Sequence, residues 1–266
     1  MGPWPRRPRL YLPLSRQLDE PASGARGSIA LLTHATGQVF VVATPIGHLQ
    51  DITLRALDVL RSVDLILCED TRVTRKLLSA HGIEGKTLMR LNEHSPAAID
   101  RLIETMAGKT IALVSDSGTP GISDPGARFI ERLSRCAQFK IIPIPGPSAA
   151  AAIMSASGLG RDGFVFLGFL PRAPRKIRKQ LAACRSDRKA VVFYESPHRL
   201  TATIGLIAEA WPQSQLVIGR ELTKEYEEII RGRAADVGRA LEHKGKILGE
   251  ITVVWEHGGK TQNSSA

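Results

Sequence analysis

The feature that most constrains this chain is a repeated alternation of short apolar runs with amphipathic segments, which begins near Gln38. Each run is rich in Val and Ile and is followed by a turn and a segment with helical periodicity; the runs are residues 39–43, 65–68, 111–115, 140–144, 164–167, 190–194, 216–219 and 250–255. Continuous apolar runs are typical of strands that are covered on both faces, as in parallel sheets. The alternation therefore predicts an α/β fold with mostly parallel or mixed sheets.

The same pattern divides the chain into two parts. Segments 51–63 and 96–106 are expected to be helices, with Asp51 or Thr53 available to cap the first. The proline-rich stretch 143–148 should end a strand, and an alanine-rich helix should follow over 149–155. We therefore predict an N-terminal α/β domain over 37–146, a C-terminal α/β domain over 147–258 and a tail over 259–266.

Residues 1–36 differ from the rest of the chain. They contain five arginines, and prolines at several positions interrupt any helix. We expect this leader to be a disordered extension, or a product of a start codon assigned too far upstream.

Composition excludes several classes of protein. There is no run of eighteen apolar residues, so no membrane-spanning helix is expected. Cys68, Cys136 and Cys184 are odd in number and far apart, which argues against a disulfide scaffold and a zinc site and favours a cytoplasmic protein. No metal site is predicted. The net charge of +10 favours polyanionic partners.

The loops that follow the predicted strands are the candidate sites, because ligands bind at the carboxyl ends of parallel strands. The most informative loop is 115–126, with three glycines, two prolines and two aspartates. It is longer than a plain connection, so we interpret it as a ligand cradle rather than a long turn capped by Asp124. It contains neither a dinucleotide fingerprint nor a Walker motif.

Other strand ends allow two interpretations each. Glu69-Asp70-Thr71-Arg72 either lines a cleft or caps a helix, with Thr71 as the cap and an exposed ion pair. Ser148 either caps the helix that begins at 149, or it belongs to an anion-binding site at the N-terminus of that helix. The acidic and basic residues of 195–199 and 220–225 either form salt bridges with each other or line a substrate cleft.

A strongly basic segment follows the predicted strand at 164–167. Residues 172–189 contain eight basic residues and one acidic residue. Such runs are often solvated helix faces, but a bias of one sign favours contact with nucleic acid. Few aromatic residues accompany it, so stacking on bases would be limited within this segment.

Seven motifs occur in a fixed order: TPIGHLQDIT (44–53), EDTR (69–72), SDSGTPGISDPG (115–126), PGPSA (145–149), GFLP (168–171), FYESPHR (193–199) and RELTK (220–224). In these the chain resembles the ribosomal RNA small subunit methyltransferase I family of the tetrapyrrole methylase superfamily. The resemblance implies S-adenosylmethionine as cofactor and a two-domain fold with the active-site cleft between the domains. It also implies a cytoplasmic homodimer that methylates the ribose 2′-hydroxyl of a cytidine in the decoding centre of 16S rRNA, within the small ribosomal subunit.

By analogy with that superfamily, the resemblance assigns the cofactor residues; the candidate bases and the RNA-binding residues named after them follow from their charge and their place at strand ends. The cofactor residues are Pro45, Ser117, Gly118, Thr119, Ile122, Ser148, Ala149 and Leu222. The candidates for a catalytic base are Asp70, Glu195, Glu221 and a neutral Lys224. The RNA-binding residues are Arg72, Arg172, Arg175, Lys176, Arg178, His198 and Arg199.

The sequence departs from the family pattern at three places. His48 stands where Asn is usual, Ser117 where Ala is common, and Leu248 where a Lys usually precedes Gly-Glu. The first two leave backbone contacts intact, and the third would lower RNA affinity if that Lys contacts RNA.

The sequence is also compatible with two rival functions. One is methylation of a porphyrin or corrin ring, against which the basic segment argues. The other is an RNA-binding assembly factor that has lost catalysis, against which the intact glycine-rich loop argues.

Overall fold

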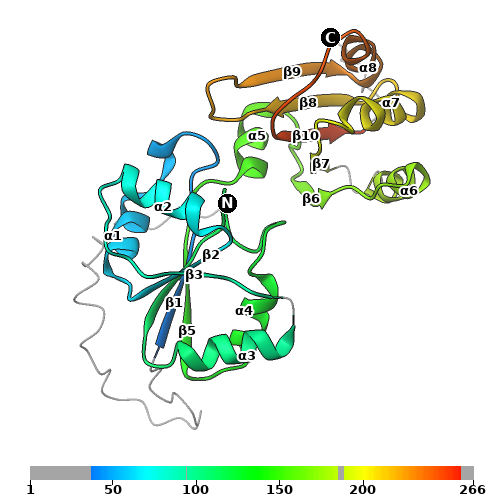
Figure 1. Ribbon diagram of the computed structural model, residues 1–266. Helices are drawn as coiled ribbons and strands as arrows, with labels where there is room; N and C mark the ends of the chain where they lie inside the picture. The colour runs from blue at the N-terminus through cyan, green and yellow to red at the C-terminus, as the bar shows by residue number, and fades with distance from the viewer. Residues whose placement is uncertain (1–36, 94, 185–188, 259–266) are drawn as a thin grey trace, which may run out of the picture. The chain divides into compact units, whose positions relative to one another are not determined.

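The computed structural model describes residues 37–93, 95–184 and 189–258 (Figure 1). The predicted leader, the predicted tail and part of the basic segment (185–188) lie outside these residues. The described chain contains two separate five-stranded sheets. No helix among the described residues combines the length and the apolar character that crossing a bilayer requires.

The first sheet is entirely parallel, with strand order β3-β2-β4-β1-β5. Its strands are β1 (Gly37–Val42), β2 (Leu65–Cys68), β3 (Leu88–Arg90), β4 (Thr110–Leu113) and β5 (Phe139–Ile144). Pro143 is tolerated in β5 because this strand is at the edge of the sheet, where a missing N–H breaks no ladder on the outer side.

Helices cover both faces of this sheet (Figure 1). They are the 3₁₀ helix η2 (Leu49–Asp51), α1 (Leu54–Ser62), α2 (Thr71–Ala80), α3 (Pro96–Thr105) and α4 (Ala127–Leu133). On one face Leu102 of α3 and Phe129 of α4 pack in one core cluster with Leu67 and Ile111 of the sheet. Burial on both faces explains the continuous apolar runs of β2 and β4.

The second sheet has strand order β6-β7-β10-β8-β9. Its strands are β6 (Phe164–Phe169), β7 (Ala190–Glu195), β8 (Gln215–Arg220), β9 (Glu228–Arg233) and β10 (Ile251–Glu256). Only β6 and β7 pair in parallel, whereas β10 is antiparallel to both β7 and β8, and β8 is antiparallel to β9.

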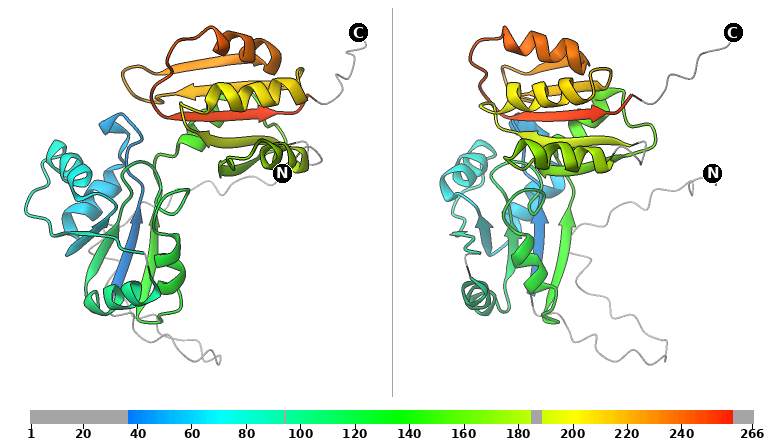
Figure 2. Two further views of the ribbon diagram at one scale, coloured as in Figure 1. Left: turned by 45° about the vertical axis from the view of Figure 1, so that its right-hand side comes forward. Right: turned by 90° about the vertical axis from the view of Figure 1, so that its right-hand side faces the viewer.

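Helices also cover both faces of the second sheet. They are α5 (Ala149–Ser157), α6 (Pro174–Cys184), α7 (Leu200–Ala210) and α8 (Ala234–Glu242), of which α7 and α8 lie side by side in Figure 2. Ile204 of α7 and Val237 of α8 belong to one core cluster with Phe193. Ile153 of α5 belongs to a different cluster with Val192 on the other face.

The predicted α/β fold with parallel or mixed sheets is confirmed: the first sheet is parallel and the second is mixed. Uninterrupted apolar runs report cover on both faces rather than strand direction, so they did not show which strands of the second sheet are antiparallel. Strands β3 and β9 were not predicted from the sequence. Both are short or half-buried: β3 has three residues, and no residue of β9 is fully buried.

The structure decides four helix caps that the sequence left open or assigned to another residue. Asp70, not Thr71, is the N-cap of α2 and accepts from Arg72 N–H. Asp124 does not cap α4, whose N-cap is Gly126; there the Glu93 carboxylate accepts from the N–H groups of Gly126 and Phe129 at 3.0 and 2.7 Å. Ser148 occupies the N-cap of α5 but makes no side-chain cap hydrogen bond, and Thr53 rather than Asp51 caps α1.

Candidate functional site

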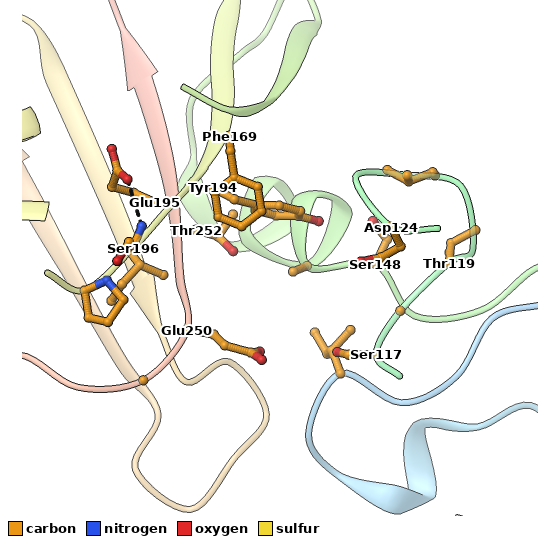
Figure 3. Close-up of a pocket in the computed structure, with 17 residues that line it drawn as sticks. Ser117, Thr119, Asp124, Ser148, Phe169, Tyr194, Glu195, Ser196, Glu250 and Thr252 are labelled. Atoms are coloured by element: carbon orange, nitrogen blue, oxygen red, sulfur yellow. Dashed lines mark hydrogen bonds between the residues drawn. The ribbon is translucent and has the colours of Figure 1, made fainter. Parts of the chain in front are cut away.

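A pocket of about 300 Å³ is lined by residues from both halves of the chain (Figure 3). On one side are residues of the glycine-rich loop and the start of α5, among them Ser117, Thr119, Asp124 and Ser148. Opposite them are Glu195 and Ser196 at the end of β7, and Phe169 and Tyr194 lie between the two sides. The volume is at the lower end of the range for small-molecule sites.

The glycine-rich loop is fixed to the end of β1. Thr44 and Gly118 exchange two backbone hydrogen bonds of 2.8 and 3.1 Å, and the Thr44 hydroxyl donates to Ser115 O at 3.1 Å. Gly118 has φ of +80°, a conformation that glycine adopts without strain. The turn that follows β1 therefore holds the loop in one position.

A second set of contacts fixes the loop to the start of α5. The Thr119 hydroxyl donates to Pro147 O at 3.0 Å. A Cβ at Gly146 would lie 3.0 Å from Ala43 Cβ, so a glycine allows the PGPSA segment to approach β1 closely. The loop, β1 and the start of α5 thus form one wall of the pocket.

The opposite wall depends on the antiparallel direction of β10. Ile251 pairs with both Glu195 and Arg220, so the start of β10 lies beside the ends of β7 and β8. This register brings Glu250 and Thr252 to the pocket. A parallel β10 would have placed its opposite end there.

The charge of the pocket is negative. Its lining includes Asp124, Glu195 and Glu250 and, among the described residues, no Arg, Lys or His. Burial, together with the nearby carboxylates of Glu69, Asp116 and Glu250, raises the pKa of Asp124 to about 6. Burial also raises the pKa of Tyr194, and the Asp124 charge adds to the effect. Such a pocket favours a ligand that carries positive charge.

Six of the eight predicted cofactor residues line this pocket: Ser117, Gly118, Thr119, Ile122, Ser148 and Ala149. The other two do not line it. Pro45 is buried in the turn after β1, and Leu222 packs against the core cluster that includes Ile153.

Asp70 does not line the pocket. Its carboxylate bonds to Arg72 N–H at 2.8 Å and pairs with the Arg72 guanidinium at 2.5 Å. These hydrogen bonds hold the pKa of Asp70 well below its usual range. The residue therefore caps α2 and pairs with Arg72, which corresponds to the second interpretation of the EDTR motif.

Glu195 lines the pocket, but its carboxylate has a full set of partners. It accepts from Thr203 Oγ1 at 2.7 Å and Ser196 N–H at 2.8 Å, and it lies 3.4 Å from Arg199 Nη2. Its side chain has no exposed surface. In Figure 3 the carboxylate lies on the far side of the pocket from Asp124.

Lys224 lines a different hollow, beside Gly47 and His48. Its ammonium group is 2.9 Å from Glu221 Oε1 and 3.2 Å from Glu250 Oε2. Partial burial opposes the charged form, but the two carboxylates outweigh burial and raise the pKa of Lys224. The structure therefore does not support the neutral Lys224 that a role as base would need, and Glu221 is engaged by the same ion pair.

The predicted RNA-binding residues fall into two groups. Arg172, Arg175, Lys176 and Arg178 are exposed on or just before α6, and Arg178 pairs with Glu209 at 2.5 Å. Arg72 and His198 are also exposed. Arg199 differs, because its guanidinium donates to Leu170 O at 3.3 Å and to Pro171 O at 2.9 Å. Arg199 thus ties the GFLP turn to the end of β7.

Several residues of the pocket were not predicted from the sequence, chiefly Asp124, Phe169, Tyr194 and Glu250. Phe169 is 59% exposed, which is unusual for a large aromatic side chain at a strand end. Tyr194 and Phe169 belong to the motifs FYESPHR and GFLP, so their motifs were recognised but not their roles. Nothing in the sequence showed that Glu250 would reach the pocket, since that depends on strand direction.

Comparison with known proteins identifies the family. Residues 38–238 match the family model described as tetrapyrrole (corrin/porphyrin) methylases. The chain is 44% identical over 195 residues to a ribosomal RNA small subunit methyltransferase I from Leptospira biflexa serovar Patoc, covering 73% of this chain and 81% of the relative. It is 42% identical to the protein of that name from Bacillus subtilis, covering 83% of this chain and 75% of the relative.

A solved structure shows the same fold. A crystal structure of diphthine synthase superposes with a TM-score of 0.63 at 19% identity, covering 83% of this chain and 90% of that protein. At this identity the likeness concerns the fold alone.

Methylases of this kind use S-adenosylmethionine, which supplies a methyl group bound to a positively charged sulfur. The pocket fits such a donor, because its carboxylates favour a cation and no basic residue occurs in its described lining. Ser117, Gly118, Thr119, Ile122, Ser148 and Ala149 would hold it. The chain belongs to the tetrapyrrole methylase family and, within it, to the ribosomal RNA small subunit methyltransferase I family, and its cofactor is S-adenosylmethionine.

Proposed function

We propose that the protein methylates the ribose 2′-hydroxyl of a cytidine in the decoding centre of 16S rRNA. One observation carries the proposal: an acidic pocket for a cationic methyl donor has the exposed aromatic ring of Phe169 in its lining, and the strongly basic helix α6 follows that residue in the chain. The methyl donor, a nucleobase and the phosphate backbone of RNA would each have a matching surface in this arrangement.

The basic residues before and on α6 supply the phosphate contacts of the proposal. Arg172, Arg175 and Lys176 are exposed, and no acidic residue occurs in α6. Lys and Arg side chains that neutralise phosphates supply most of the non-specific affinity of nucleic-acid-binding proteins. The names of the relatives, which are ribosomal RNA methyltransferases, support RNA as the polyanion.

Phe169 supplies a stacking surface. Its ring packs edge-on against Tyr194 with a centroid distance of 5.6 Å, and Tyr194 packs in the same way against Phe166 at 5.0 Å. The ring is thus held from behind while more than half of the residue stays exposed. Sequence-specific RNA recognition commonly stacks an unpaired base on such a ring.

The basic segment argues against a porphyrin or corrin substrate. A precursor ring needs only a few basic contacts, whereas residues 172–189 contain eight basic residues. The acidic pocket also argues against an assembly factor without catalysis, because RNA binding alone needs no such pocket.

The proposal includes a homodimer that acts in the cytoplasm on the small ribosomal subunit. Light scattering on the purified protein tests the dimer, for which twice the chain mass of 28.9 kDa is expected. A monomer at assay concentration would contradict it.

Transfer of tritium from labelled S-adenosylmethionine tests the activity. The substrates are small ribosomal subunits that lack this methylation, the naked 16S rRNA, and uroporphyrinogen. Label should enter RNA, and nucleoside analysis after complete digestion should show 2′-O-methylcytidine. Label on the porphyrinogen, on a base carbon or nitrogen, or on no RNA would contradict the proposal.

A further inference from the structure

We propose that Asp124 is the catalytic base that takes the proton from the attacking ribose hydroxyl. This inference rests on the proposed function, since it assigns a residue to that reaction. A hydroxyl is a weak nucleophile until its proton begins to leave, and a correctly placed base contributes about 10²–10⁴-fold to the rate.

Among the described residues, Asp124 is the pocket carboxylate that remains free for this task. Glu195 is engaged by Thr203, Ser196 N–H and Arg199. Glu250 is 3.2 Å from the Lys224 ammonium group. Asp124 has no hydrogen bond or ion pair with any described residue, and it is only half-buried in the pocket wall.

The backbone holds Asp124 in place by an unusual local conformation. The preceding residue, Ser123, has φ of +64°, which is uncommon for a residue other than glycine. Conformations of this kind persist where the surrounding structure imposes them, and they gather at functional sites.

The contact that accompanies this conformation is with β6. Gly168, itself at φ of +62°, leaves room for the Ser123 side chain, because a Cβ on Gly168 would lie only 2.6 Å from Ser123 Oγ. Phe169 follows Gly168 directly in the chain. Ser123, which precedes the proposed base, therefore lies against Gly168, which precedes the proposed stacking ring of Phe169.

Backbone hydrogen bonds also fix the rest of the loop. Gly121 N–H donates to Pro125 O at 3.2 Å, and Ile122 N–H donates to Thr119 O at 3.3 Å. These two bonds enclose residues 119–125 in a tight turn with Asp124 on its pocket side. A base on a rigid element keeps its carboxylate in one position without ordering at each turnover.

The surroundings of Asp124 suit proton transfer near neutral pH. The charged groups that face it are Glu69, Asp116 and Glu250, and the phenol of Tyr194 is nearby. With burial, these carboxylates raise the pKa of Asp124 to about 6. The group is then ionised at pH 7 and is a stronger base than an ordinary aspartate.

Atoms and charge balance in the proposed step. The 2′-oxygen forms a bond to the methyl carbon as the bond from that carbon to sulfur breaks, and its electron pair stays on sulfur. The O–H bond of the ribose breaks, and its proton passes to the Asp124 carboxylate. The protonated Asp124 later releases this proton to water.

The test compares Asp124→Asn with Asp162→Asn, a control carboxylate that is exposed and outside the pocket lining. Single-turnover methylation of undermethylated small subunits should fall by about 10²–10⁴-fold in Asp124→Asn and stay unchanged in the control. Affinity for S-adenosylhomocysteine, measured by calorimetry, and affinity for RNA should stay unchanged in both. Asp124→Glu, which retains a carboxylate, should recover part of the rate.

A second readout needs neither a variant nor turnover. Carbon-13 NMR of the aspartate carboxyls in the free wild-type protein should show one group with a midpoint near pH 6.

A pH profile of the methylation rate adds a third readout. The wild-type rate should rise with pH through the same midpoint, and this rise should disappear in Asp124→Asn. If Asp124→Asn does not fold, the NMR midpoint and the rate of Asp124→Glu still decide the question.

Three results would overturn the assignment. These are an undiminished rate in folded Asp124→Asn, a loss of S-adenosylhomocysteine affinity that accounts for the whole effect, or an Asp124 midpoint at the ordinary value of 3.8. A different result would refute the proposed function instead, namely wild-type protein that binds S-adenosylhomocysteine but methylates no RNA.

Discussion

The hydroxyl of Thr203 donates a hydrogen bond of 2.7 Å to the carboxylate of Glu195, and both residues are buried. Thr203 is on α7 and Glu195 ends β7, so the bond joins the helix to the strand that borders the pocket. A buried carboxylate is expensive unless its oxygens are satisfied. We therefore expect Glu195 to stabilise the pocket wall rather than to exchange protons with a substrate.

Thr203→Val should therefore reduce stability with little effect on chemistry. Valine keeps the shape of the side chain but leaves a buried carboxylate with one donor fewer, which costs about 1.5–3 kcal/mol. Urea unfolding measures the loss. Thr201→Val on the exposed face of the same helix is the control and should leave stability nearly unchanged. A folded Thr203→Val protein with a collapsed methylation rate would contradict this interpretation.

Gly168→Ala should separate stability from catalysis. An alanine at φ of +62° costs about 1–2 kcal/mol, and its Cβ pushes the Ser123 hydroxyl aside. Gly158→Ala is a matched control, since Gly158 has φ of +73° and nothing lies near its Cβ position. Both should lose similar stability in thermal unfolding, but only Gly168→Ala should slow methyl transfer.

Removing the displaced hydroxyl should rescue that defect. In the double variant Gly168→Ala with Ser123→Ala, the Oγ atom that lies 2.6 Å from the new Cβ is gone, and the remaining Ser123 Cβ position is 3.9 Å away. The rate should return toward that of wild type. An equal rate loss in Gly158→Ala, or no rescue, would show that the contact does not position Asp124.

Phe169→Ala should weaken RNA binding without changing cofactor binding. Stacking of a base on an aromatic ring is worth about 1–3 kcal/mol, so RNA affinity should fall by roughly 5- to 150-fold. Phe164→Ala is the control, because Phe164 is 44% exposed at the other end of β6 and does not line the pocket. Filter binding measures the affinity for RNA, and calorimetry measures the affinity for S-adenosylhomocysteine. Weaker S-adenosylhomocysteine binding in Phe169→Ala would instead place the ring against the cofactor.

The basic residues at α6 should control the salt dependence of RNA binding. Replacing Arg172, Arg175 and Lys176 together with Gln should reduce the slope of log affinity against log salt by about 0.7–0.9 for each phosphate that the protein no longer neutralises. Arg178→Gln should change the slope less, because its guanidinium already pairs with Glu209. An unchanged slope in the triple variant would mean that RNA binds elsewhere.

Asp124→Asn should become more stable than wild type as the pH rises. The folded state raises the pKa of Asp124 from 3.8 to about 6, so between these values the folded protein binds a proton that the unfolded chain does not. Wild-type stability relative to the variant therefore falls as pH increases from about 4 to above 6. Because the group is partly exposed, we expect a difference of about 1 kcal/mol.

Urea unfolding of both proteins at pH 4 and pH 7.5 measures this difference. Carboxylates with lowered pKa values, such as Asp100 and Glu228, act in the opposite direction but equally in both proteins, so the comparison removes them. A relative stability that does not change with pH would contradict the raised pKa.

The sequence alone determined the fold class and most of the strands. Apolar runs such as 65–68 and 190–194 mark strands because covering both faces of a sheet requires them, and this requirement is local. The glycine-rich loop 115–126 was identified as a ligand cradle for a similar reason, since its residues cannot form a helix or a strand. The predicted cofactor residues of this loop and those at the start of α5 line one pocket.

Tertiary structure decided what the carboxylates do. Asp70 and Glu195 are candidate bases in the sequence, but Arg72 engages one and Thr203 with Arg199 the other. The sequence allowed Asp124 to be a helix cap, but Glu93, 31 residues earlier, accepts the hydrogen bonds of the free N–H groups at the start of α4. Asp124 therefore stays at the pocket. The antiparallel β10 brings Glu250 there as well. The ionisation and availability of a carboxylate depend on charges and donors that are distant in the sequence, and no local pattern contains that information.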